Sequence, residues 1–256
     1  MTKIVGILNI TPDSFYDGGK YLEQKDILKK TEDLIEEGAD IIDIGAESTR
    51  PGATPINKDQ EIARIKDSLC KIVKIAHKAK VATAIDSYKY EVIKFALDNG
   101  IDMVNDQKGL ETDKKVELVR SFGVPVVVMH SLTVPTDRNI NLDTKVDVIS
   151  QLKIWIEKKV NYLVDRGIKK ESIIFDPGIG FGKTAKQNYE IIKRCQELKT
   201  PEIKIYIGHS NKGFLKILGN QEAFTLASSV ILMGKGVDFL RVHDVGSHKA
   251  LQLNFF

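Results

Sequence analysis

The 256-residue chain has few cysteines and no long apolar run. Its two cysteines, Cys70 and Cys195, lie in helix-like segments without CxxC spacing, so we expect buried, reduced thiols rather than a disulfide or a metal site. No apolar stretch approaches the roughly 20 residues that span a bilayer, and residues 1–10 lack the pattern of a signal peptide. These absences predict a cytoplasmic protein with no membrane partner.

A strong excess of one charge is also missing. The 38 basic and 35 acidic residues leave a net charge of +3, and no basic run with interleaved aromatic residues is present. We therefore expect no nucleic-acid partner, whereas a small anionic substrate is compatible because local cations matter more than net charge. Hydrophobic residues make up 42% of the chain, which is enough for a sizeable core.

Apolar, β-branched runs alternate with helical patterns along the whole chain. The runs lie at residues 4–10, 41–44, 81–85, 103–104, 124–129, 173–175, 203–207 and 239–242. The helical patterns lie at residues 22–37, 58–79, 91–98, 114–122, 145–166, 186–198, 221–235 and 247–253. Continuous apolar runs are typical of parallel strands that are covered on both faces.

Eight such repeats without a linker predict an α/β fold, a (β/α)8 TIM barrel, as a single domain over residues 1–256. The competing open, doubly wound sheet needs a glycine-rich dinucleotide turn after an early strand. Residues 6–8, Gly-Ile-Leu, are not such a turn. The barrel is therefore the favoured fold.

Each apolar run ends in a polar residue that is able to take part in chemistry. In order these residues are Asn9, Asp43, Asp86, Asn105, His130, Asp176, Ser210 and Arg241. In a parallel barrel all eight ends open onto the face that carries the active site. Long loops at residues 11–21, 48–57 and 130–143 follow three of the runs and are functional candidates.

Three of these residues, Asp86, Asn105 and Asp176, suit a flat polar heterocycle. A carboxylate accepts two parallel N–H bonds from an amidine-like edge, and an amide both donates and accepts. Each aspartate alone is better interpreted as a cap of the next helix or loop. Their occurrence together after strands three, four and six weakens that alternative.

Cations follow the second, seventh and eighth runs, at Arg50, Lys212, Arg241 and His243. The ends of strands seven and eight of a barrel commonly bind phosphate, and arginine offers a planar fork of donors. The alternative for Arg241 is a surface salt bridge, which its place at the end of an apolar strand disfavours. Lys183, in a glycine-rich stretch, is equally compatible with a phosphate contact and with a solvated loop position.

Oxygen ligands follow the first run, at Asn9 and at Asp13, Ser14 and Asp17 in the loop beyond it. Such ligands suit Mg²⁺, which binds through one or two protein groups plus substrate phosphates. No His/Cys cluster has the spacing of a zinc site.

Four motifs resemble those of the dihydropteroate synthases. They are Gly-Ile-Leu-Asn-Ile-Thr-Pro-Asp-Ser-Phe at 6–15 with Asp-Gly-Gly at 17–19, Asp-Ile-Gly-Ala-Glu-Ser-Thr-Arg-Pro-Gly at 43–52, Asp-Pro-Gly-Ile-Gly-Phe-Gly-Lys at 176–183, and Arg-Val-His-Asp at 241–244. They recur in the order and spacing of that family across nearly the whole chain. The resemblance implies a folate-pathway transferase that joins 6-hydroxymethyl-7,8-dihydropterin diphosphate to 4-aminobenzoate, with Mg²⁺, and it suggests a homodimer.

The resemblance also implies a role for each site residue. It implies that Asp86, Asn105, Asp176 and Lys212 bind the pterin, with Asp43 nearby, and that Asn9 binds Mg²⁺. It further implies that Thr49, Arg241 and His243 bind the diphosphate, and that Arg50 and Ser210 close over the aminobenzoate. Phe181 counts as substrate-binding, and Asp86, Lys212, Arg241 and His243 count as catalytic. An arylamine is already nucleophilic, so no strong general base is needed once diphosphate leaves, which agrees with the lack of a Ser-His-Asp arrangement.

Four positions depart from the family's usual pattern. Asn211 stands where Arg is usual, Ser87 where Thr is usual, Ser131 where Met is common and Ala46 where Gly is frequent. Ser87 and Ser131 are shared with divergent, sulfonamide-tolerant members. We hypothesise that the aminobenzoate pocket is altered and that sulfonamides bind poorly, a hypothesis that an ordinary, low inhibition constant for sulfamethoxazole would remove.

Three other functions compete with this interpretation. A corrinoid-dependent pterin methyltransferase would share the Asp/Asn set but not the motifs at 6–15 and 241–244. A Schiff-base aldolase built on Lys212 would place that lysine within a strand core. A barrel that binds pterin without turnover is permitted by Asn211 and disfavoured by the retained cations.

Overall fold

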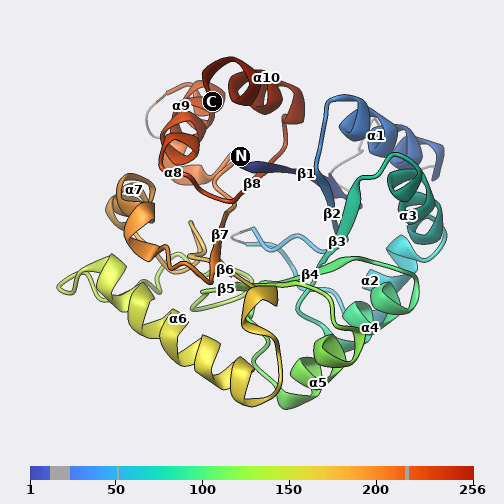
Figure 1. Cartoon of the computed structure of the whole chain (residues 1–256), viewed down its shortest axis with the longest axis horizontal. Coiled ribbons are helices and arrows are strands. Elements are labelled where there is room, and N and C mark those ends of the chain that lie inside the picture. Colours follow the sequence, from blue (N-terminus) through green and yellow to red (C-terminus); the bar gives the residue numbers. More distant parts are fainter. Residues whose placement is uncertain (12–23, 51, 217–218) are drawn as a thin grey trace.

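The computed structural model describes residues 1–11, 24–50, 52–216 and 219–256. Its eight strands are all parallel and close into one barrel in sequence order, with the helices arranged around it (Figure 1). The strands are β1 Lys3–Asn9, β2 Ile41–Gly45, β3 Ala82–Asp86, β4 Met103–Asp106, β5 Val126–Met129, β6 Ile173–Asp176, β7 Lys204–Ile207 and β8 Phe239–Val242. The predicted (β/α)8 barrel is confirmed.

Ten helices lie within the described residues. They are α1 Gln24–Glu36, α2 Lys58–Ile65, α3 Leu69–Lys78, α4 Tyr90–Asp98, α5 Asp113–Phe122, α6 Val148–Asp165, α7 Ala185–Arg194, α8 Gly213–Lys216, α9 Gln221–Gly234 and α10 Val245–Phe255. The 3-10 turns η2 Lys170–Ser172 and η3 Cys195–Leu198, like α8, are too short to leave a periodic pattern in the sequence. The predicted loop at 11–21 lies, beyond Thr11, outside the described residues.

The single helix predicted over residues 58–79 was wrong, because two helices, α2 and α3, occupy this stretch. At the break, the Ser68 N–H donates to the Ile65 carbonyl at 3.1 Å, and the Ser68 hydroxyl bonds the same carbonyl at 3.3 Å. These short-range bonds compete with the helical ladder, as serine side chains commonly do. The apolar periodicity alone does not register such a break.

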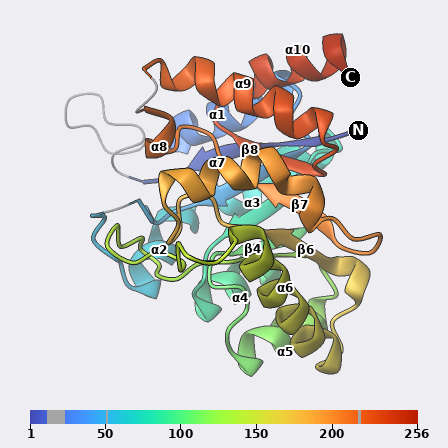
Figure 2. The same ribbon diagram turned by 90° about the vertical axis from the view of Figure 1, so that its left-hand side faces the viewer.

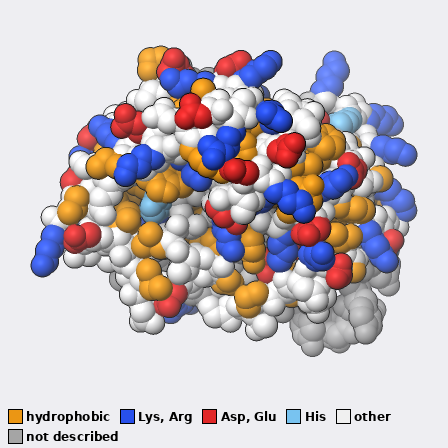
Figure 3. Space-filling model, turned by 90° about the horizontal axis from the view of Figure 1, so that it is seen from below, with side chains coloured by type: hydrophobic (Ala, Val, Ile, Leu, Met, Phe, Trp, Pro, Cys, Tyr) orange, Lys and Arg blue, Asp and Glu red, His pale blue; other side chains and the backbone are white. Residues whose placement is uncertain are grey.

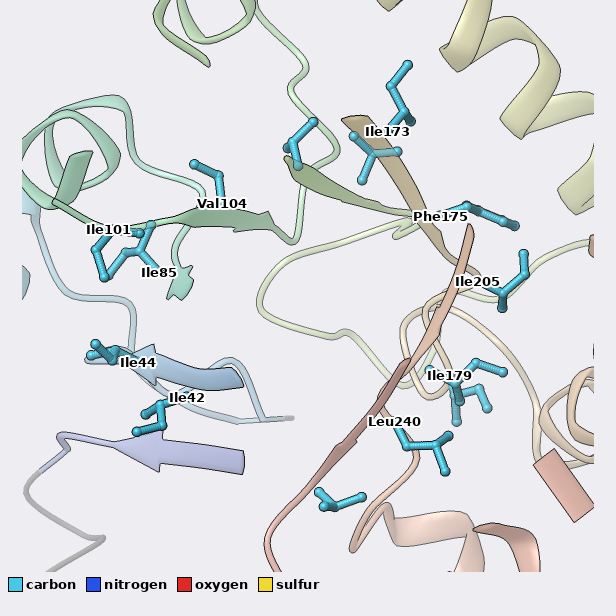
Figure 4. Close-up of a cluster of buried hydrophobic side chains, with 14 of the residues drawn as sticks. Ile42, Ile44, Ile85, Ile101, Val104, Ile173, Phe175, Ile179, Ile205 and Leu240 are labelled. Atoms are coloured by element: carbon cyan, nitrogen blue, oxygen red, sulfur yellow. The ribbon is translucent and has the colours of Figure 1, made fainter. Parts of the chain in front are cut away.

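Buried side chains form one layer inside the barrel and another outside it. The inner layer consists of Val5, Ile41, Ala84, Met103, Val127, Ile174, Tyr206 and Phe239. The outer cluster lies between strands and helices, where Ile44, Phe175 and Ile205 project away from the barrel interior (Figure 4). Because successive strand residues face opposite sides, both sides of each strand need apolar residues.

A repeated Gly-apolar-Asp-apolar element precedes three strands and supports the barrel at its amino-terminal end. Asp40 accepts a hydrogen bond from the Ile4 N–H at 2.8 Å, and Asp102 does so from Thr83. Asp238 accepts in the same way from the Ile205 N–H at 2.8 Å. Each aspartate therefore satisfies a backbone donor of a neighbouring strand, which otherwise has no partner where the ladder begins.

The surface and the cysteines agree in part with the sequence. Cationic and anionic side chains are interspersed over the face shown in Figure 3, as the small net charge predicts. Both thiols are free, but Cys70 is exposed and only Cys195 is buried, so the expectation of two buried thiols was wrong for Cys70. Among the described residues, no helix combines the length and the apolar character that a membrane span requires.

Candidate active site

A large cavity of about 1900 Å³ opens at the carboxyl ends of the strands. In Figure 2 this is the side that carries α8, opposite the two chain ends. The predicted site residues Asn9, Thr49, Arg50, Asp86, Asn105, Asp176, Phe181, Ser210, Lys212, Arg241 and His243 all line it. Asp43 does not line the cavity, because its side chain is fully buried beneath the floor.

The floor of the cavity is an ion-pair cluster centred on Arg241. Its guanidinium donates from Nε to Asp43 and from Nη2 to Asp86, the latter at 2.7 Å. The other Asp86 oxygen accepts from the Gln107 amide at 2.6 Å, and the Asn105 amide donates to Asp43 at 3.0 Å. Asp86 thus has a protein partner on each of its two oxygens.

Burial sets the protonation of this cluster. It raises the pKa of Asp86 to about 7, against the opposing charge of Arg241. Burial alone would lower the pKa of Arg241, but the carboxylates of Asp43 and Asp86 raise it. Arg241 therefore stays charged, and its charge opposes the protonation that burial favours at Asp86.

Asp176 and Lys212 both line the cavity, and their charges interact. One Asp176 oxygen accepts from the Gly178 N–H at 2.7 Å, and the other has no hydrogen bond to a described residue. The Lys212 ammonium lies 4.4 Å from the centroid of the Phe181 ring. Burial raises the pKa of Asp176 to about 6 and lowers that of Lys212 to about 8, so both are charged near pH 7.

A group of cations surrounds His243. Burial, followed by the charges of Arg241, Arg50 and Lys212, lowers the pKa of His243 to about 4, so its imidazole is neutral. Nδ1 of this ring lies 2.9 Å from the Ser210 hydroxyl. Three cations around a neutral donor form a ready site for an anion, and bringing an anion there would relieve their mutual repulsion.

Lys183 is neither a solvated loop residue nor, in this structure, free to reach a ligand. Its ammonium, in a side chain only 6% exposed, is bonded to Nδ1 of His130 at 2.9 Å, to the His130 carbonyl at 3.2 Å and to the Phe181 carbonyl at 2.9 Å. The interpretation as a solvated lysine was therefore wrong. His130, whose ring lies edge-on to Trp155, is one of its anchors rather than a residue of the cavity wall.

A second buried cluster, which sequence reasoning missed, holds the loop after β2. Lys89 pairs with Glu47 at 2.5 Å and with the fully buried Glu61 at 2.6 Å. Glu47 also accepts from the Ile56 N–H at 2.9 Å, which closes the loop that carries Thr49. In the sequence, the available signal was Glu61, a charged residue on the apolar face of a predicted helix. The sequence pattern does not identify the residue with which it pairs.

Some predicted ligands are outside the described part of the chain. Asp13, Ser14 and Asp17 belong to residues 12–23, which the structure does not describe. Asn9 ends β1, and its side chain is partly exposed. Its Oδ1 lies next to Gly45 of β2, 3.5 Å from the place that a Cβ at this position would occupy. Within the described residues, no group of three or more His, Cys, Asp or Glu side chains is placed to hold a metal ion.

The fold and the cavity together define a parallel barrel whose mouth carries carboxylate, amide and cationic side chains. The chain matches the family model of pterin-binding enzymes over residues 5–243. It therefore belongs to the pterin-binding enzyme family.

Two relatives illustrate the similarity in sequence. The chain is 38% identical over 252 residues to a dihydropteroate synthase of Clostridium beijerinckii, covering 95% of this chain and 89% of that protein. It is 36% identical over 253 residues to a probable bifunctional folylpolyglutamate synthase/dihydropteroate synthase of Haloferax volcanii, covering 97% of this chain. The chain spans only 30% of the length of that bifunctional relative.

Two solved structures illustrate the similarity in fold. Dihydropteroate synthase of Anaplasma phagocytophilum, with bound 6-hydroxymethylpterin-monophosphate, superimposes with a TM-score of 0.89 at 33% identity, covering 97% of this chain and 96% of that one. Dihydropteroate synthase of Xanthomonas albilineans, with 4-aminobenzoic acid, gives a TM-score of 0.89 at 30% identity, covering 98% and 91% of the two chains.

Proposed function

We propose that the protein is a dihydropteroate synthase, which joins 6-hydroxymethyl-7,8-dihydropterin diphosphate to 4-aminobenzoate and releases 7,8-dihydropteroate and diphosphate. The observation that carries this proposal is that one cavity holds both a free carboxylate oxygen of Asp176 and a cation group around His243. A pterin diphosphate has matching ends, a ring with an amidine-like edge and an anionic tail.

The ring end is recognised by residues of neighbouring strands. Asp176 accepts from the amidine-like edge, and the Asn105 amide, which lines the same cavity, bonds ring heteroatoms. Lys212 donates to an acceptor of the ring while its charge keeps Asp176 ionised. Asp86 lies beside the ring as the partner of Arg241 and Gln107.

In the chemical step the bond between the pterin methylene carbon and the diphosphate oxygen breaks, and diphosphate takes the electron pair. The nitrogen of 4-aminobenzoate then forms the new bond to that carbon and releases one proton to solvent. Arg50, Arg241 and His243 stabilise the charge that develops on the leaving group, and they are in place before the reaction. No buried base is required of the protein.

Mg²⁺ is proposed as the cofactor, with the Asn9 side-chain oxygen as its protein ligand. The residues present fit this ion, because a partly exposed amide oxygen lines the cavity and Mg²⁺ needs few protein ligands when substrate phosphates supply others. When bound, Mg²⁺ would neutralise charge on the diphosphate. An Asn9→Ala variant should need more Mg²⁺ for half-maximal rate.

A homodimer in the cytoplasm is the proposed state of the protein. Large apolar side chains are exposed on α9, on α10 and at the residue after α10, namely Val230, Ile231, Leu253, Phe255 and Phe256. Such a surface favours burial against a second copy. The free thiols of Cys70 and Cys195 suit a reducing compartment. Light scattering on the purified chain tests the dimer.

Weak sulfonamide binding is proposed from Asn211. This residue has φ = +56°, and its N–H donates to the Thr225 hydroxyl at 3.3 Å. Its short side chain stands where the family usually has the guanidinium of an arginine, beside the second-substrate entrance. An inhibition constant for sulfamethoxazole measured on the wild type and on Asn211→Arg tests this. Equal constants would remove the proposal.

One assay tests the activity itself: diphosphate release from the pterin diphosphate, with and without 4-aminobenzoate and with and without Mg²⁺. We expect release that depends on both, together with a pteroate product. Release that is independent of 4-aminobenzoate, or none at all, would overturn the synthase proposal.

A further inference from the structure

Ser210 makes two contacts with one residue of the anion-binding group. It follows β7, is 7% exposed, and its hydroxyl oxygen lies 2.9 Å from Nδ1 of the His243 ring. The same oxygen accepts a hydrogen bond from the His243 backbone N–H at 3.3 Å. The hydroxyl is therefore held against both the main chain and the side chain of His243.

These two contacts determine where the proton of the neutral imidazole lies. An oxygen that already accepts the backbone N–H directs its own hydrogen elsewhere, and Nδ1 is the acceptor within reach among the described residues. If Nδ1 carried the proton instead, the hydroxyl oxygen would have to accept both the Nδ1–H and the backbone N–H, and its own hydrogen would turn away from the ring toward the cavity. The favoured arrangement has Ser210 donating to Nδ1, so the ring proton is on Nε2.

We propose that Ser210 is a positioning residue, which holds His243 as the Nε2–H tautomer so that the neutral ring donates a hydrogen bond to the anion in the cavity. The inference rests on the diphosphate-releasing function proposed above, and it deepens that function by naming what orients one donor. In the opposite tautomer Nε2 would present a lone pair to the anionic oxygens. That contact would be repulsive, and the ring would then oppose binding.

The positions of both partners are fixed by a buried chain of hydrogen bonds. His209, next to Ser210 and fully buried, bonds the Ser229 hydroxyl from Nε2 at 2.8 Å, and Ser229 lies 2.8 Å from Nε2 of His248. His248 in turn bonds the carbonyl of Asp244, the residue after His243. The turn after β7 and the start of α10 are thereby joined through α9, which keeps the hydroxyl at the ring.

The experiment compares the wild type with Ser210→Ala, Ser210→Thr and the control Ser121→Ala. The Ser121 hydroxyl also bonds one neighbouring group, the Leu118 carbonyl at 2.8 Å, but on α5 and away from the cavity. The ¹⁵N shifts of the His243 ring report the tautomer directly. Calorimetric titration with inorganic diphosphate reports the anion site, and steady-state rates report the KM for 4-aminobenzoate.

We expect a single Nε2–H tautomer in the wild type and both tautomers in Ser210→Ala. Diphosphate should bind about threefold to tenfold more weakly to Ser210→Ala, the effect of one neutral hydrogen bond, whatever the change in the KM for 4-aminobenzoate. Ser210→Thr, which keeps a hydroxyl, should restore the wild-type ring signals, and Ser121→Ala should match the wild type throughout.

Two results would overturn the inference: an Nδ1–H ring in the wild type, or an unchanged tautomer and diphosphate affinity in Ser210→Ala. A loss in Ser210→Ala that appears only in the KM for 4-aminobenzoate is the second of these results, because it leaves the tautomer and the diphosphate affinity unchanged. Failure of the proposed function is distinguishable. In that case the wild type shows no turnover that depends on 4-aminobenzoate, whereas the ring signals and the diphosphate titration still report on Ser210.

Discussion

Asp176→Asn is the substitution that best separates recognition of the ring from support of the fold. The carboxylate accepts the Gly178 N–H with one oxygen and presents the other to the cavity. An asparagine side chain keeps an acceptor for Gly178 but turns an N–H₂ group toward the donors of the ligand. The fold should therefore survive while one charge-assisted bond is lost and replaced by a donor–donor contact.

The expected magnitude follows from the type of bond. A hydrogen bond to a charged group contributes about 1.5–3 kcal/mol, so the pterin should bind about 10- to 150-fold more weakly to Asp176→Asn. The pH dependence has a definite sign. Because burial raises the pKa of Asp176 to about 6, the carboxylate is ionised at pH 7.5 and largely protonated at pH 5. Wild-type affinity should fall about tenfold per pH unit below pH 6.

Calorimetric titration with 6-hydroxymethylpterin between pH 5 and pH 8 measures both effects. Asp238→Asn is a matched control, because Asp238 accepts the Ile205 N–H at the opposite end of the barrel and does not line the cavity. It should leave the affinity and its pH profile unchanged. A flat wild-type profile, or equal affinities of wild type and Asp176→Asn, would refute the reasoning.

Three further predictions concern stability and are checked by urea unfolding. Lys183→Met leaves two buried carbonyls and a ring nitrogen without their donor, so the free energy of unfolding should fall by about 1–3 kcal/mol; an unchanged midpoint would contradict this. Tyr206→Phe removes a buried hydroxyl that has no partner among the described residues, so the free energy of unfolding should not fall. A decrease in that free energy of more than about 1 kcal/mol would show that the hydroxyl is paired. Asn57→Ala deletes the cap of α2, including its bond from the Gln60 N–H, and should cost about 1 kcal/mol, with no change counting against it.

The barrel could be predicted because its signals are local and repeated. Runs such as the one that became β5 are apolar throughout, and glycine follows many of the helices, as Gly123 follows α5 with φ = +66°. The break between α2 and α3 could not be predicted in the same way. It depends on Ser68 bonding the Ile65 carbonyl, and serine is tolerated on many unbroken helices.

Most residues that line the cavity were predictable from the sequence, but the bonds between them were not. A polar residue after each strand identifies side chains such as Asn105 and His243, because barrel geometry brings all strand ends to one mouth. It does not say which of them pair. The bond from Lys183 to His130 joins residues 53 positions apart, and the Lys89–Glu61 pair joins residues 28 apart. Such partners are set by how the loops pack, which no local pattern encodes.

The same limit explains why three aspartates that look alike in the sequence are not alike in the molecule. Barrel closure brings Arg241 of β8 into hydrogen-bonding contact with Asp43 of β2 and Asp86 of β3. These two residues lie 198 and 155 positions away along the chain. Asp43 is thereby sealed under the floor, and both oxygens of Asp86 are occupied. Asp176 on β6 makes no hydrogen bond to Arg241 and keeps one oxygen for a ligand. Under the proposed function, the pairing of Arg241 with the other two acids therefore determines which carboxylate remains free to bind the ring.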